Sequence, residues 1–199
     1  MHRVRRTIPR WLPGAILGLV AAIGLILGAG GVPSEPAGAA QGRGYGVLHI
    51  TGPAVPGPLT HPALGAGGIR VLDFRLSLQA SPNSSDPNDP WAIAPEFSEL
   101  IITKEVDKAS PLLYLYGATG QHFGYVMLRL LEAGATGDPY QEIILEDAVI
   151  AGVTNRMVYR PTGDYAHLED VAFRYTMIRW TSLTGGTTAA WDLVENQGL

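Results

Sequence analysis

The sequence predicts a mainly β protein, a closed or nearly closed antiparallel β-barrel with one short α-helix. The 199 residues include 25 Gly and 15 Pro, which favours many turns between short strands. Apolar and polar residues alternate along much of the chain, whereas one segment after the N-terminal region has the pattern of a helix. Because 46% of the residues are apolar and 16% are charged, the chain can also build a core.

The first 40 residues have the three-part layout of a secretory signal. A basic start with four Arg precedes a long uncharged apolar stretch, and a small-residue segment then offers cleavage after Ala39 or Ala40. Residues 11–33 are also long enough for an uncleaved membrane anchor helix. We therefore expect residues 1–40 to be a signal peptide or anchor, residues 41–46 a linker, and residues 47–199 an exported domain, secreted or periplasmic.

The exported domain is acidic. The first 40 residues hold four of the 14 basic and one of the 18 acidic residues, so 10 basic and 17 acidic residues remain, a net charge of about −7. Nucleic-acid binding requires neutralisation of phosphates by clustered basic residues. The charge balance therefore excludes a nucleic-acid partner.

Alternation predicts the strands in chain order. In residues 69–78, one expected wet face (Val71, Asp73, Arg75, Ser77) alternates with one dry face (Leu72, Phe74, Leu76, Leu78). Two segments rich in Pro, Gly, Asn and Ser, 53–68 and 79–96, are expected to be loops. Residues 141–160 are long enough for one bent strand or two, with Ile143 and Leu145 on one face and Glu142 and Glu146 on the other. The remaining expected strands are residues 47–52, 97–106, 122–134, 169–183 and 189–196.

The one helix expected in the domain covers Ser110–Ala118. Ser110 is suited to cap its start, and Pro111 fits the first turn, where a missing N–H costs nothing. The expected buried stripe consists of Leu112, Leu115 and Tyr116, and Gly117 or Gly120 would end the helix.

No catalytic or metal-binding motif is present. The chain has no Cys, and the five His, at positions 2, 49, 61, 122 and 167, are not at metal-ligand spacings. Glu105 and Asp107, beside Lys104 and Lys108, are better interpreted as solvated ion pairs than as an acid/base pair. We therefore expect no catalytic residue, no metal and no cofactor, and a protein that is not an enzyme.

The segment "FSELIITKEVDKASPLLYLYGATGQHFGYVMLRLLEAG" resembles the haemolysin-coregulated protein (Hcp) family, the tube subunits of the type VI secretion system. "VAFRYTMIRWTS" and "AAWDLVEN" are similar to later parts of that family, and the resemblance covers about residues 47–196. The matching positions, which we take as structural and assembly residues, are Thr103, Lys104, Asp107, Lys108, Ala109, Ser110, Pro111, Ala118, Thr119, Gly120, His122, Trp191 and Asp192.

The resemblance implies a closed antiparallel β-barrel of two sheets with one short α-helix beside it, six-membered rings that stack into a tube, and a lumen that carries small effectors. The partners it implies are therefore other copies of the chain and effector or cargo proteins. In the motif, Asp107 and Lys108 would hold the turn and His122 would lie at the edge of the next strand.

The leader departs from the family pattern, because tube subunits loaded from the cytoplasm should have no signal peptide. The Pro-rich segments 53–68 and 81–95 also exceed what the family core needs. An alternative is therefore an exported binding module that uses its loops for a protein or carbohydrate partner. Trp91, Trp180 and Trp191 are candidate contact aromatics, although packing is the favoured role for them.

Overall fold

The structure, a computed structural model, describes residues 44–82, 93–133 and 137–199. The expected leader and residues 41–43 of the expected linker lie outside these ranges. Within them, no helix is long and apolar enough to cross a membrane.

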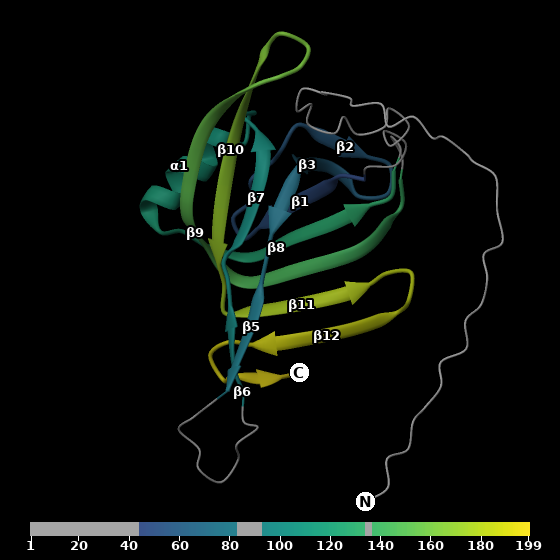
Figure 1. Cartoon of the computed structure of the whole chain (residues 1–199), viewed down its shortest axis with the longest axis vertical. Helices are drawn as coiled ribbons and strands as arrows, with labels where there is room; N and C mark the ends of the chain where they lie inside the picture. The colour runs from purple at the N-terminus through teal and green to yellow at the C-terminus, as the bar shows by residue number, and fades with distance from the viewer. Residues whose placement is uncertain (1–43, 83–92, 134–136) are drawn as a thin grey trace, which may run out of the picture. The chain divides into compact units, whose positions relative to one another are not determined.

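The described ranges contain one helix and thirteen strands (Figure 1). In chain order they are β1 (Gly46–Thr51), β2 (Leu59–His61), β3 (Gly65–Val71), β4 (Asp73–Arg75), β5 (Leu78–Pro82), β6 (Ile93–Phe97), β7 (Leu100–Glu105), α1 (Ser110–Thr119), β8 (His122–Leu131), β9 (Pro139–Tyr159), β10 (Tyr165–Arg174), β11 (Met177–Ser182), β12 (Thr187–Asp192) and β13 (Gln197–Gly198).

Eleven strands form one antiparallel sheet, in which β9 is the central element. The order along the main path is β13-β12-β11-β9-β8-β1-β3-β2, and β10, β7 and β4 branch from β9. The first half of β9 pairs with β8 and β11, and its second half pairs with β10. One strand of 21 residues therefore belongs to both parts of the curled sheet.

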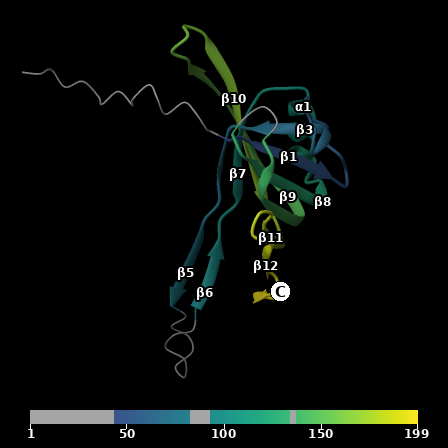
Figure 2. The same ribbon diagram turned by 90° about the vertical axis from the view of Figure 1, so that its right-hand side faces the viewer.

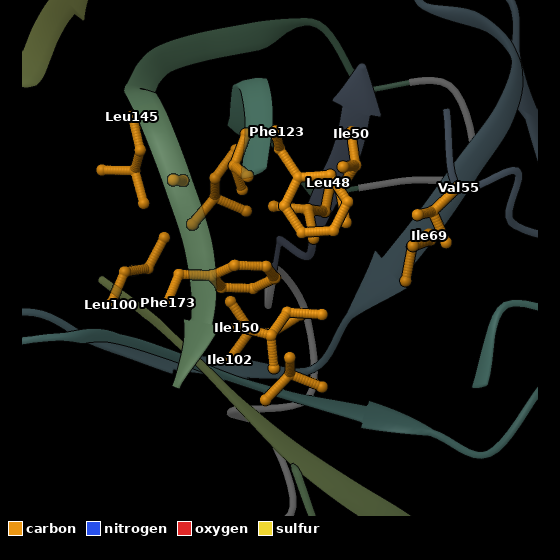
Figure 3. Close-up of a cluster of buried hydrophobic side chains, with 14 of the residues drawn as sticks. Leu48, Ile50, Val55, Ile69, Leu100, Ile102, Phe123, Leu145, Ile150 and Phe173 are labelled. Atoms are coloured by element: carbon orange, nitrogen blue, oxygen red, sulfur yellow. The ribbon is translucent and has the colours of Figure 1, made fainter. Parts of the chain in front are cut away.

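The core lies between the inward faces of these strands and α1 (Figure 3). Alternation explains which side chains enter it: Leu48 and Ile50 on β1 are buried, as are Ile143 and Leu145 on β9. Each such side chain stabilises the fold by about 1.5–3 kcal/mol relative to exposure. The sequence prediction for β9, with Ile143 and Leu145 opposite Glu142 and Glu146, is confirmed, and the segment forms a single strand.

One hairpin forms a separate sheet, and another projects from the main sheet. β5 and β6 pair with each other as a separate two-stranded sheet, and Figure 2 shows them side by side. The second hairpin, here called the β9–β10 arm, consists of residues 153–168 and projects at the top of Figure 1.

Closure of the expected barrel stays a prediction. The main path of the sheet ends in β13 on one side and in β2 on the other, while the branch from β9 through β10 and β7 reaches β4, which is separated from β3 by one residue. The mainly β class, the antiparallel pairing and the single helix of the described domain are confirmed.

Three predictions about individual strands are wrong. Residues 69–78 do not form one strand but belong to β3, β4 and β5, and the expected dry face fails because Leu72 and Leu78 are exposed while Val71 is buried. The expected loops contain β2, the start of β3, and much of β5 and β6. The expected strand 169–183 is divided into β10 and β11.

Candidate functional site

Asp107 and Ser110 of the motif lie around Lys104, whose side chain is completely buried. On β7, Leu100 and Ile102 point into the core, and Lys104 occupies the next inward position. Its Nζ atom lies 2.6 Å from Oε1 of Glu169 and 3.0 Å from Oδ1 of Asp107. It also donates to the carbonyl oxygen of Glu105 at 2.7 Å. The prediction that Lys104 belongs to a solvated ion pair is therefore wrong.

Glu169 is the buried counter-ion that the sequence interpretation missed. It lies on β10 at an inward position, two residues before the buried Val171, and its side chain has no exposed surface. Its Oε1 atom accepts hydrogen bonds from Lys104 and from the hydroxyl of Ser110, the latter at 2.7 Å. Its Oε2 atom is buried and has no hydrogen-bond partner among the described residues. An acid at a core-facing strand position was the available signal for this contact.

The "DKASP" turn connects β7 to α1 through side-chain contacts. Oδ1 of Asp107 accepts the N–H of Ala109 at 2.8 Å, and Oγ of Ser110 accepts the N–H of Asp107 at 3.0 Å. Lys108 is exposed and Ala109 is buried. Asp107 thus forms hydrogen bonds within the turn, whereas a role for Lys108 in holding it stays a prediction.

The helix start differs from the prediction. Ala109 is the N-cap residue and no side chain caps the helix, whereas Ser110 is the first helical residue. The expectation that Ser110 caps the helix is therefore wrong, because its hydroxyl is occupied by Asp107, Lys104 and Glu169. Pro111 does lie in the first turn.

The structure also shows which face of the helix is buried and where the helix ends. Leu113 is the buried apolar residue of α1, and Leu115, expected to be buried, is 53% exposed. Gly120 ends α1 in the left-handed conformation with φ 64°, a backbone region that favours Gly. The hydroxyl of Thr119 donates to the carbonyl of Leu115 at 2.9 Å.

A second polar chain runs on the opposite face of β7 and β10. The hydroxyl of Thr103 donates to Asp170, which also pairs with Arg156 at 3.3 Å. Burial alone would raise the pKa of Asp170, but the hydrogen bonds from Thr103 and Arg156 and the neighbouring positive charges together lower it. Asp170 is therefore held as a carboxylate that links β7, β9 and β10.

His122 and Asp147 form the one pair here that resembles part of a catalytic site. Nδ1 of His122 lies 2.7 Å from Oδ1 of Asp147, and both side chains are more than half exposed. A nucleophile hydrogen-bonded to the His would be needed for a triad, and the hydrogen bonds among the described residues include none. The described residues also contain no cluster of three or more His, Asp or Glu side chains that could hold a metal.

Trp191 and Asp192 lie apart from the Lys104 cluster, at the other end of the fold. Phe97 of β6 contacts both Trp180 and Trp191, with ring centroids 5.8 Å and 6.2 Å apart. Oδ1 of Asp192 accepts the N–H groups of Val194 and Glu195. Both Trp side chains are partly buried against the core, which agrees with the favoured packing role, whereas Trp91 lies outside the described residues.

Comparison with known proteins places this architecture in a family. The profile of the family described as "Type VI secretion system effector, Hcp" matches residues 47–181. The chain belongs to the Hcp family. A curated relative, the "Major exported protein" of Pseudomonas aeruginosa, is 34% identical over 129 residues, which cover 62% of this chain and 73% of that protein.

Solved Hcp structures share the fold. Hcp1 from Salmonella typhimurium has a TM-score of 0.62 at 21% identity, over 79% of this chain and 100% of that one. The secreted protein Hcp3 from Pseudomonas aeruginosa has a TM-score of 0.57 at 24% identity, over 75% and 98% of the two chains. The Hcp profile spans Lys104, Ser110 and Glu169 and ends before Trp191 and Asp192. The assignment of the motif residues as structural and assembly positions stays a prediction.

Proposed function

We propose that this Hcp-family chain is a structural subunit that assembles with itself into rings of six copies, which stack into tubes. The observation that carries the proposal is the presence of two separate exposed apolar patches on one chain. The first consists of Tyr114 and Leu115 on α1, which are 42% and 53% exposed. The second consists of Leu72 and Val106, which are 47% and 45% exposed. They line one pocket with Pro58 and Leu59, and the same pocket is also lined by the charged residues Arg70, Glu105 and Asp107.

Two different patches suit a contact in which one copy's first patch meets its neighbour's second patch. Such a head-to-tail contact repeats around a ring and closes when the rotation per subunit allows it. Exposed apolar clusters of this kind commonly mark protein–protein contacts. The six-membered ring is what the Hcp resemblance implies, and membership of the family supports it.

The motif cluster would serve assembly indirectly. Lys104, Glu169 and Ser110 fix the start of α1 against β7 and β10. Because Tyr114 and Leu115 follow on that helix, the buried cluster would hold the first patch in a fixed orientation. The role we infer for these residues is positional and not catalytic, and effector or cargo proteins are the further partners of the ring.

We also propose that the chain is exported by its own leader, residues 1–40. The three-part layout of the leader supports this, as does the name "Major exported protein" of the Pseudomonas aeruginosa relative. N-terminal sequencing of the exported protein tests it. A protein that starts at residue 40 or 41 indicates a cleaved signal. A protein that starts at Met1 and is found in the membrane fraction, with its domain outside the cytoplasm, indicates an anchor. Retention of the protein in the cytoplasm would contradict the proposal.

An exported binding module is the second candidate. The separate β5–β6 sheet favours it, because a two-stranded hairpin held apart from the main sheet is suited to present a segment to a partner. This candidate predicts a protein that works without ring formation, using its loops for a protein or carbohydrate.

Electron microscopy of the purified protein, negatively stained, tests the ring. The natural chain should give closed rings, and Leu115→Glu and Leu72→Glu should each abolish them. Leu183→Glu is the matched control, because Leu183 is 41% exposed but belongs to neither patch. Rings that persist in both patch variants would contradict the head-to-tail contact, and a natural chain without rings would favour the binding module.

A further inference from the structure

The outer half of β9 has an open edge. On the side where β8 lies, pairing ends with His122 opposite Val149. From there to Tyr159, β9 pairs only with β10, on its other side, among the residues that the structure describes. In the β9–β10 arm this edge extends beyond the other strands (Figure 1).

The hairpin turn shows which residues direct their backbone groups to the open edge. The N–H of Arg160 donates to the carbonyl of Asp164 at 2.8 Å, and the carbonyl of Arg160 accepts from Gly163 at 3.0 Å. Residue 160 therefore faces β10. Because the direction alternates along an antiparallel strand, Val158 and Arg156 also face β10, whereas Tyr159, Met157 and Asn155 face the open edge. The carbonyl of His167 accepts the N–H of Val106 on the side of β10 that faces away from β9, which agrees with this alternation.

The side chains of the edge-facing residues are exposed and uncharged. Met157 is 65% and Tyr159 62% exposed, and Asn155 is also exposed. Tyr165 on β10 packs edge-to-face against Tyr159, with ring centroids 5.3 Å apart.

The charged residues of the arm do not protect this edge. Arg156 and Arg160 lie on the opposite face of the strand and are already paired, with Asp170 and with Glu105 and Asp164. Natural proteins usually protect an open edge with Pro, a bulge or an inward-pointing charge. Asn155–Tyr159 contains no Pro, and its register with β10 is regular.

We propose that this edge docks a second copy of the chain by antiparallel strand pairing, β9 against the partner's β9, about a two-fold axis at Met157. In this register Met157 lies opposite the partner's Met157, and Asn155 lies opposite the partner's Tyr159. All three are edge-facing residues, so each opposed pair can exchange both backbone hydrogen bonds.

Charge does not oppose a second copy as the occupant of this edge. The whole chain has a formal net charge of −4, so two copies repel each other over most of their surfaces. An uncharged edge whose neighbouring Arg side chains are neutralised by their own acids permits close approach of identical chains. Pairing also buries Met157 and Tyr159 without leaving a charge unpaired.

This contact is independent of the proposed ring. A two-fold contact uses the same surface on both copies and cannot by itself close a ring of six. In a ring, the pairing would join the arms of two rings. A result against the strand pairing would leave the proposed head-to-tail contact standing. A result without rings would leave the proposed strand pairing standing.

Disulfide cross-linking tests the register directly, because the full chain contains no Cys. Directly opposed residues in a hydrogen-bonded antiparallel pair have Cα atoms about 5.5 Å apart, which suits a disulfide. The full chain carrying Met157→Cys, expressed with its own leader and mildly oxidised, should form a disulfide-linked dimer. Leu183→Cys, at a site that is 41% exposed and lies in neither patch, is the control and should remain uncrosslinked. Equal rates of dimer formation in the two variants would overturn the proposal.

Proline substitutions test the direction of the backbone groups. Met157→Pro removes an edge-facing N–H and leaves the β9–β10 bonds intact, whereas Val158→Pro removes an N–H bonded to β10. We expect Met157→Pro to halve the mass of the associated particle in light scattering, without increasing amide exchange in β10. Val158→Pro should increase that exchange, and Met157→Thr, which keeps the N–H, should weaken association less than Met157→Pro. An unchanged mass for Met157→Pro, or exchange like that of Val158→Pro, would contradict the proposal.

Discussion

The Nζ atom of Lys104 lies 2.6 Å from Oε1 of Glu169, and neither side chain has any exposed surface. Each charge is costly to bury alone, and each compensates the other. The pair joins β7 to β10, and through Ser110 it also includes the first residue of α1. It is therefore the contact on which the position of the helix depends.

Removing one partner of this pair should be far more damaging than removing both. Lys104→Met leaves the Glu169 carboxylate buried and uncompensated, which should reduce the free energy of unfolding by about 3–5 kcal/mol. The double variant Lys104→Met/Glu169→Met, which has no buried charge, should recover most of that loss. Urea denaturation measures the free energy of unfolding of the single and the double variant. A double variant no more stable than the single one would contradict the role of the pair.

Ser110→Ala should destabilise the fold by about 1–3 kcal/mol, because its buried hydroxyl donates to Glu169 and accepts the N–H of Asp107. Thr119→Ala is the control, since the Thr119 hydroxyl makes an exposed bond within the same helix and its loss should cost about 0.5 kcal/mol or less. Thermal and urea unfolding check the difference. Equal effects would show that the Ser110 hydroxyl is not part of the cluster.

Stability should fall at mildly acidic pH because of His49. Burial, and after it the charge of Arg129, lower the pKa of His49, and both ring nitrogens are buried without a hydrogen-bond partner in the described part of the chain. Since the folded pKa lies below the unfolded value, the unfolded state binds the proton better. The contribution is fully present above the unfolded pKa, about 6.5, and is lost as pH falls through it toward the folded value.

The measurement is the free energy of unfolding of the natural chain and of His49→Phe between pH 8 and pH 5. The natural chain should lose more stability than the variant as the pH falls below about 6.5. Parallel curves for the two proteins would contradict the assignment.

The β5–β6 hairpin should depend on its aromatic contacts. Phe97 packs against Trp180 and Trp191, and such pairs contribute about 0.5–1.5 kcal/mol each beyond the area they bury. Trp191→Ala should therefore increase amide exchange in β5 and β6 and leave exchange in β10 unchanged. If exchange in the hairpin does not change, another contact holds it.

The strands with strict alternation were the predictable part of the fold. In β9 the buried Ile143 and Leu145 alternate with Glu142 and Glu146, so periodicity alone assigned both faces. The end of α1 could also be predicted from the local sequence, because Gly120 adopts a conformation that few other residues tolerate.

Non-local contacts explain what the sequence pattern missed. Lys104 resembled a surface charge because its partner Glu169 is 65 residues away. Residues 53–68 resembled a loop, yet Gly65 and Gly67, with φ of 80° and 85°, lie in β3, and the absence of a side chain at Gly68 lets Val47 pack against it. The β5–β6 hairpin lies largely in a polar segment, and its Phe97 packs against Trp180 and Trp191, which follow it by more than 80 residues.

The measurement that most directly tests the central claim is the solution mass of the purified exported protein, by size exclusion with light scattering. Self-assembly predicts a stable particle of about six times the mass of one chain, or twelve times where the arms pair, against 21.2 kDa for the 199-residue chain with its leader. The particle should persist on dilution. A monomer at high protein concentration would contradict the account.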